Sequence, residues 1–258
     1  MTSPARQQVL LGFHAVRARL RNEAASIQSV LIDRDRQDAR LKALSAELQA
    51  SGCSVSLESG RQLDRLAKGQ RHQGVLAFAD HRESSLRYED LLDGHGFMVF
   101  LDGVTDPHNL GAVLRTAEAS GARAVVAPKD HSAPLNEVAM RVSAGAGETL
   151  PYMQVTNLVR AIEQAQDKGY WALAFADEAG SSLYQQSLAD QPHLLIFGSE
   201  DKGIRRLVRE QADALVTYPR WEGVPGLKAP LAGGFAGADL LRRSQARQPK
   251  VYPSLCFP

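Results

Sequence analysis

Apolar residues recur along the first third of the chain in short runs and at helical spacings. The short runs predict strands at residues 29–32, 55–57 and 74–78. Helices are expected around them, at residues 12–20, 38–50 and 62–68. The middle helix shows the clearest period, because Leu41, Leu44 and Leu48 follow one another at steps of three and four. The pattern predicts a small α/β domain over residues 1–80.

A polar stretch at residues 81–93 is expected to be a linker, and beyond it strand and helix patterns alternate. Strands are predicted at residues 98–101, 124–127, 152–155, 170–176, 193–197 and 214–218. Helices are predicted at residues 110–120, 136–144, 158–168, 204–211 and from about 227 to 245. Gly121 and Gly169 are expected as left-handed helix caps, and Asn157 as an N-cap. Such alternation predicts a second domain, residues 94–258, with a mostly parallel sheet covered by helices on both faces.

Composition narrows the class of protein. The 258 residues are 44% hydrophobic, and no apolar run reaches the roughly 18 residues of a membrane helix. The first residues lack the apolar core of a secretion signal. The two cysteines, Cys53 and Cys256, lie far apart and support neither a disulfide framework nor a metal site. We therefore expect a cytoplasmic protein with no membrane partner and no metal.

The net charge of +1 is unevenly distributed. Residues 1–80 contain 12 lysines and arginines against 8 aspartates and glutamates, a balance of +4 that leaves −3 for the rest. Most of the excess is arginine, whose planar guanidinium suits phosphate recognition. Acidic residues lie among these arginines, so charge alone leaves two interpretations open, a nucleic-acid surface and an ordinary solvated face.

Two polar turns that follow predicted strands carry the candidate chemistry. Residues 97–116 read as strand, polar turn and helix, and residues 193–204 repeat that layout. Ligands of open α/β sheets bind at such strand ends. Each polar residue also has a structural interpretation. Asn109 could cap a helix that begins at Leu110, Arg115 could be an ordinary surface arginine, and Glu200 could be a first-turn carboxylate.

The commoner catalytic motifs are missing from the sequence. It contains no G-x-G-x-x-G, no P-loop, no H-E-x-x-H and no G-x-S-x-G, and its seven histidines lack metal-ligand spacing. Residues 106–116 read D-P-H-N-L-G-A-V-L-R-T, and residues 197–203 read F-G-S-E-D-K-G. These two stretches resemble the first two motifs of the SpoU/TrmH branch of the SPOUT superfamily, the RNA 2′-O-ribose methyltransferases. The likeness covers about residues 94–246.

The N-terminal stretches 12–16 and 71–75 are similar to the RNA-binding domain of one subgroup of that branch, RlmB, which methylates a guanosine of 23S ribosomal RNA. The resemblance implies a SPOUT α/β knot, in which the C-terminal segment threads a deep trefoil knot, and a homodimer that uses S-adenosylmethionine. It implies catalytic roles for Arg115, Asn109 and Glu200. It implies donor contacts at Gly198, Tyr218 and Leu227. RNA contacts are expected at Arg17, Arg71, His72 and Arg115.

The third motif of the branch departs from its usual form. Leu227 is kept, but Lys228 stands where the family has asparagine. True divergence and a local frameshift in the sequence both explain such a run. Three functions therefore stay open. They are a methyltransferase acting on 23S ribosomal RNA, a transfer-RNA ribose methyltransferase of the same branch, and an RNA-binding homologue with impaired catalysis.

Overall fold

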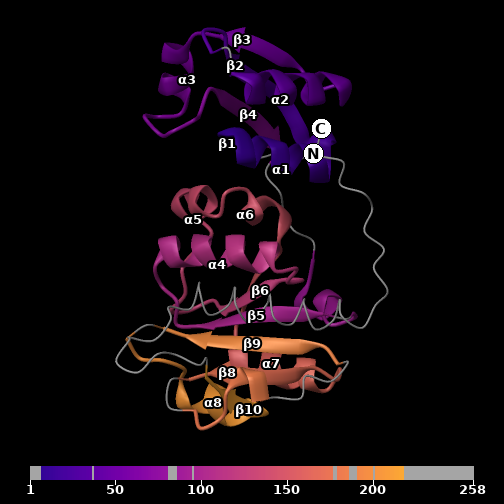
Figure 1. Ribbon diagram of the computed structural model, residues 1–258, viewed down its shortest axis with the longest axis vertical. Coiled ribbons are helices and arrows are strands. Elements are labelled where there is room, and N and C mark those ends of the chain that lie inside the picture. The colour runs from indigo at the N-terminus through magenta and orange to yellow at the C-terminus, as the bar shows by residue number, and fades with distance from the viewer. Residues whose placement is uncertain are drawn as a thin grey trace, which may run out of the picture.

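The computed structural model describes seven stretches of the chain, residues 7–36, 38–80, 86–94, 96–176, 179–185, 191–199 and 201–217. Within them the chain forms two α/β units, each built on its own sheet (Figure 1). Several expectations concern residues outside these stretches. They are the contacts of Glu200, Tyr218 and Leu227, the helix at 227–245 and the knot.

The first unit is a mixed four-stranded sheet with the strand order β1-β4-β2-β3. Its strands are β1 (Gln7–Leu11), β2 (Ile27–Asp33), β3 (Val55–Glu58) and β4 (Val75–Asp80). Its helices are α1 (Phe13–Glu23), η1 (Ala24–Ser26), α2 (Ala39–Ala50) and α3 (Gly60–Leu66). As predicted, Leu41, Leu44 and Leu48 form the buried face of α2, and the Asp38 carboxylate caps the helix by accepting from the Leu41 amide.

The second unit is a six-stranded, wholly parallel sheet with the order β10-β8-β9-β5-β6-β7. Its strands are β5 (Phe97–Asp102), β6 (Val125–Pro128), β7 (Tyr152–Val155), β8 (Trp171–Phe175), β9 (His193–Gly198) and β10 (Ala214–Val216). Its helices are η2 (Tyr88–Leu91), α4 (Pro107–Ala119), α5 (Glu137–Val142), α6 (Ala146–Thr149), α7 (Leu158–Gln166), η3 (Leu183–Gln185) and α8 (Arg206–Gln211). The prediction of a parallel sheet with helices is confirmed.

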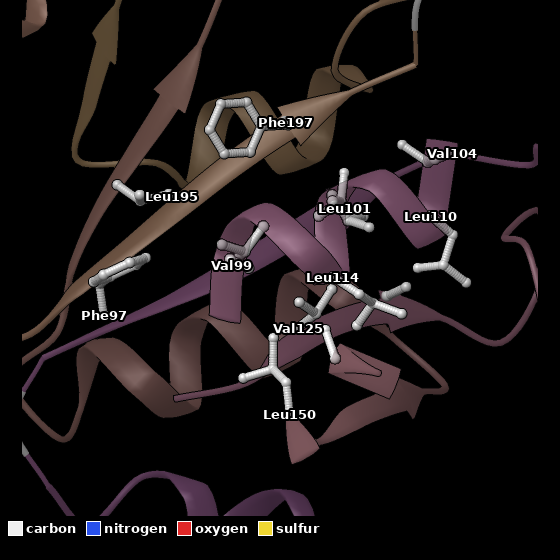
Figure 2. Packing of buried hydrophobic residues seen from close by; sticks show 14 of the residues in the cluster. Phe97, Val99, Leu101, Val104, Leu110, Leu114, Val125, Leu150, Leu195 and Phe197 are labelled. Carbon is white, nitrogen blue, oxygen red and sulfur yellow. The ribbon is translucent and has the colours of Figure 1, made fainter. Parts of the chain in front are cut away.

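Alternate residues of the central strand β5 enter two separate cores. Phe97, Val99 and Leu101 pack with α4 on one face of the sheet (Figure 2). Met98 and Phe100 pack with α7 on the other face. Three residues around η2, Tyr88, Leu91 and Leu92, join this second core. Part of the segment expected as a linker therefore packs against the larger sheet.

The predicted helix caps have the expected geometry. Gly121 and Gly169 have φ of 77° and 88°, the left-handed conformation that suits a C-cap glycine. The Asn157 side chain accepts from the Arg160 amide at the start of α7. Strand β1, in contrast, was not anticipated from the sequence, although it pairs along its full length with β4.

The strand order contains one switch point. From β5 the chain passes through α4 to β6 on one side, and from β9 it passes through α8 to β10 on the other side. Adjacent strands whose crossovers leave in opposite directions open a ligand site at their carboxyl ends. The carboxyl ends of β5 and β9 carry the two polar turns that the sequence singled out.

Candidate active site at the switch point

The turn after β5 is built to start a helix. Asp106 caps α4 by accepting from the His108 amide at 2.9 Å, and Pro107 occupies the first helical position. Asn109 therefore lies inside the first turn of α4 rather than at its cap. The interpretation of Asn109 as the N-cap of a helix beginning at Leu110 is wrong, because Asp106 has that role three residues earlier.

Arg115 lies two turns further along α4, roughly 12 Å from Pro107 at 1.5 Å per residue. Its side chain is exposed, and among the described residues it forms no hydrogen bond or ion pair. His108, seven residues earlier and also exposed, shares this face of the helix. Within the part of the chain that the structure describes, no side chain occupies the guanidinium of Arg115, so an external anion could bind it.

The turn after β9 folds back tightly on its own strand. The backbone groups of Ser199 and Gly203 exchange two hydrogen bonds, of 3.1 and 3.0 Å. A β-carbon added to Gly198 would lie 2.1 Å from the carbonyl carbon of Gly203, so only glycine allows this approach. Gly203 has a φ of 64°, which again favours glycine. The backbone conformation of this turn therefore requires glycine at both positions of the second motif.

The two turns lie side by side. Asp102, the last residue of β5, is in register with Gly198 of β9. A β-carbon on the next residue, Gly103, would contact the Ser199 side chain at 3.6 Å. The structure thus brings the first motif and Gly198 to the same edge of the sheet. Among the described residues, no hydrogen bond or ion pair joins Arg115 to this edge.

Asp102 and Arg205 form a buried link between these turns that sequence reasoning missed. The Asp102 carboxylate accepts from the Arg205 backbone N–H at 2.7 Å and from Arg205 Nε at 2.6 Å. The Asp102 side chain is 0% exposed, whereas that of Arg205 is 56% exposed. One signal could have found it, since an aspartate that ends a buried apolar strand requires a partner.

The candidate RNA-binding residues of the first unit differ in their surroundings. Arg71 is exposed and has no partner among the described residues. Arg17 is engaged with Glu47 at 2.5 Å and lies over the Phe13 ring. Both ring nitrogens of His72 form hydrogen bonds with nearby residues, one on helix α3 and one in the loop that follows it. Nε2 contacts Asp64 at 3.0 Å, and Nδ1 accepts from the Gly74 amide.

Among the described residues, no cluster of three or more histidine, cysteine, aspartate or glutamate side chains could hold a metal ion. No helix in the described stretches has the length and apolarity needed to cross a bilayer.

Comparison with known proteins identifies the family. The profile of the SpoU rRNA methylase family matches residues 96–234, and that of the RNA 2′-O ribose methyltransferase substrate-binding domain matches residues 9–85. Two relatives are named 23S rRNA (guanosine-2′-O-)-methyltransferase RlmB. The one from Ralstonia nicotianae is 40% identical over 93% of this chain and 97% of its own length. The one from Neisseria meningitidis is 37% identical over 96% of this chain and 100% of its own length.

Solved structures share the fold of both units. A crystal structure of an RNA 2′-O ribose methyltransferase superposes with a TM-score of 0.76 at 20% identity, covering 93% of this chain and 90% of that one. The SpoU methyltransferase AviRb from Streptomyces viridochromogenes, in complex with AdoMet, superposes with a TM-score of 0.73 at 18% identity over 93% and 91%. With its family profile and its relatives in agreement, the chain belongs to the SpoU rRNA methylase family.

Proposed function

We propose that this protein transfers a methyl group from S-adenosylmethionine to the ribose 2′-hydroxyl of a guanosine in 23S ribosomal RNA. One observation carries the proposal. Relatives with that activity in their names are about 40% identical over 93% of this chain. The site supports it, because the first motif and Gly198 meet at the switch point of the larger sheet.

S-adenosylmethionine supplies the methyl group on a sulfonium, which is already a strong electrophile. We propose that Gly198, Tyr218 and Leu227 contact this donor. At Gly198 the close approach of Gly203 leaves main chain, rather than side chains, at the end of β9. Such a surface suits a ligand that is recognised by backbone groups.

The acceptor hydroxyl needs help because it is a weak acid. Arg115 can hold the phosphate beside the reactive ribose with its planar fork and stabilise the negative charge on the ribose oxygen as its proton passes to water. The oxygen would take the methyl group, and S-adenosylhomocysteine would be the leaving group. The exposure of Arg115, and the lack of a partner for it among the described residues, support this role. Asn109 and Glu200 are proposed to orient Arg115 and the sugar, so that donor and acceptor meet in line.

The first unit is proposed to hold the RNA. Arg71 is exposed and unpaired within the described stretches, which suits a contact with phosphate, while His72 orients the loop that carries it. Arg17 can join after release from Glu47, since a half-exposed ion pair contributes only about 0–1 kcal/mol. A non-helical RNA segment, whose target base can be splayed out, is the expected substrate. Binding should weaken as salt rises.

The remaining features of the proposal concern organisation. Residues 1–80 form the RNA-binding domain, 81–93 connect it, and 94–258 form the methyltransferase domain with its trefoil knot. The protein works as a homodimer in the cytoplasm, without a metal. A two-fold dimer is the commonest assembly of identical chains.

The test is methyl transfer to unmodified RNA. Tritium from labelled S-adenosylmethionine should enter transcribed 23S ribosomal RNA, and nucleoside mass spectrometry should find 2′-O-methylguanosine. Label in transfer RNA but not in ribosomal RNA would favour the other substrate of the branch. RNA binding without any incorporation would leave only the binding homologue.

Removing the proposed catalytic arginine gives a second test. Arg115→Ala should lower the rate by about 10²–10³-fold, the cost of losing one group that stabilises developing negative charge. Dimerisation, measured by light scattering, should be unchanged. Arg160→Ala is the matched control, because Arg160 is an exposed arginine on α7, which covers the other face of the sheet. Retained activity in Arg115→Ala would remove Arg115 from the mechanism.

A further inference from the structure

The most unusual charge at the switch point is the carboxylate of Asp102. It is completely buried at the end of β5, and both of its oxygens accept from one residue, Arg205. A buried charge is expensive unless it is paired and hydrogen-bonded. Asp102 therefore depends on Arg205, which lies 103 positions later in the chain.

Arg205 closes the turn that follows β9. The turn leaves the strand at Gly198, doubles back through the Ser199–Gly203 bridge and returns to α8 at Arg205, the N-cap residue of that helix. Lys202 adds a hydrogen bond from its amide to Ser199 Oγ at 3.2 Å. The Asp102 carboxylate fixes the far end of this turn, because it accepts hydrogen bonds from both the backbone and the side chain of Arg205. The near end, at Gly198, is fixed by the register of β5 with β9.

We propose that Asp102 is a positioning residue for the methyl donor. Through Arg205 it holds the turn from 198 to 205 in the conformation that receives S-adenosylmethionine. This inference rests on the proposed function. It adds a residue that neither motif assigns to donor binding, since Asp102 precedes the first motif and Arg205 follows the second.

The chemistry of the pair indicates which substitutions are informative. In Asp102→Asn the amide oxygen can still accept from the Arg205 backbone, but its NH₂ group then faces the Arg205 Nε–H, and two donors oppose each other. Arg205→Ala keeps the backbone hydrogen bond and removes only the guanidinium. Arg206→Ala is the matched control. Arg206 is the next residue, and among the described residues its side chain pairs only with Glu210, an exposed neighbour on α8.

The experiment measures binding of the product, S-adenosylhomocysteine, to the full chain by calorimetry, beside hydrogen exchange of the amides at 199–204. Asp102→Asn should weaken binding at least tenfold and speed exchange in the turn. Arg205→Ala should weaken binding about three- to tenfold, and Arg206→Ala should stay within twofold of the unsubstituted protein. In steady-state kinetics Asp102→Asn should raise the KM for S-adenosylmethionine and leave the KM for RNA unchanged.

The outcomes separate the two proposals. If the unsubstituted protein does not bind S-adenosylhomocysteine, the proposed function fails and this inference fails with it. If it binds, and Asp102→Asn binds equally well, only the role of Asp102 is overturned, whatever happens to exchange. Should Asp102→Asn fail to fold, Arg205→Ala decides. An affinity equal to that of Arg206→Ala then overturns the proposal.

Discussion

The titratable side chains that are buried in this protein are stabilised in two ways, by an ion pair or by staying neutral. Asp102 and Glu148 are each paired with an arginine. His193, which is 5% exposed at the start of β9, has no such partner among the described residues, and its Nε2 atom forms no hydrogen bond with them. A histidine buried in this way is kept neutral, because burial disfavours the charged form.

The neutral state of His193 predicts a loss of stability in mild acid. Burial lowers the pKa of His193 from 6.5 to about 4. Between these values the unfolded chain takes up a proton that the folded chain refuses, so stability falls as the pH drops. The loss approaches about 3 kcal/mol at pH 4, at about 1.4 kcal/mol per pH unit. Above pH 6.5 the residue contributes no pH dependence.

Urea unfolding at pH 7, 6 and 5 measures this effect. Other groups titrate over the same range, so the comparison is with His193→Leu. This substitution replaces the imidazole by a side chain of similar size that does not titrate. The unsubstituted protein should lose more stability than His193→Leu over these two pH units. Parallel pH profiles for the two proteins would contradict the prediction.

At the scale of elements, the spacing of apolar residues along the chain predicted most strands and helices but not β1. In Gln7–Leu11 only Leu10 is fully buried, so the segment lacks the alternation of a half-buried strand. Its identity as a strand comes from pairing with β4, almost 70 residues later, and sequence period cannot report that contact. The four-residue helix α6 was missed for a similar reason, since so short a helix carries no period.

The candidate site was predictable to the same extent. Asp106, Asn109 and Gly198 could be named because each belongs to a contiguous motif. The pairing of Asp102 with Arg205 could not, because it depends on the register between β5 and β9 and on where the turn after β9 returns. A contact that depends on strand register cannot be predicted from the spacing of residues along the sequence.

Helix α4, which carries Asn109 and Arg115, is placed by its contact with α5. A β-carbon on Gly111 would lie 2.6 Å from the Ala139 carbonyl oxygen and 2.7 Å from the β-carbon of Val142. Gly111→Ala should therefore destabilise the protein by about 1–3 kcal/mol. This loss should outweigh the gain of about 1 kcal/mol from better helix propensity. Thermal unfolding measures the change.

Gly180→Ala is the control for this substitution. Apart from its chain neighbours, no atom of the described residues lies within 4 Å of a β-carbon at Gly180, and its backbone is not in the left-handed region. That variant should unfold within about 0.5 kcal/mol of the unsubstituted protein, as surface substitutions usually do. If Gly111→Ala were equally stable, the spacing of α4 and α5 would not depend on a glycine.

At the scale of the whole molecule, the two units are joined by a buried arginine. Arg19 on α1 donates from Nε and Nη2 to one oxygen of Glu148 on α6, at 2.8 and 2.5 Å. It also donates to the Asp80 carbonyl, to Gln8 Oε1 and to Ser26 Oγ, so all five of its N–H groups are used (helices α1 and α6 in Figure 1). A second link joins Gln70 to Glu137 on α5 at 2.5 Å. This hydrogen bond links the loop that carries Arg71 to the methyltransferase unit.

This coupling predicts how the two units unfold. Glu148→Gln leaves the Arg19 charge buried without a counter-charge, which typically costs about 3–5 kcal/mol. Calorimetry should show one transition for the unsubstituted protein and two for the variant, because the units no longer stabilise each other. Arg19→Met combined with Glu148→Leu should lose less stability than Glu148→Gln alone, since it buries no charge.

The control lies two positions away on the same helix. Arg17→Ala removes an ion pair with Glu47 that lies within the first unit, with side chains 34% and 37% exposed, so it should cost at most about 1 kcal/mol and keep one transition. A single transition at an unchanged temperature in Glu148→Gln would mean that the two units are held together by their other contacts, without help from the ion pair. RNA bound by the first unit would then depend on those contacts, and not on the ion pair, for its position relative to the methyltransferase site.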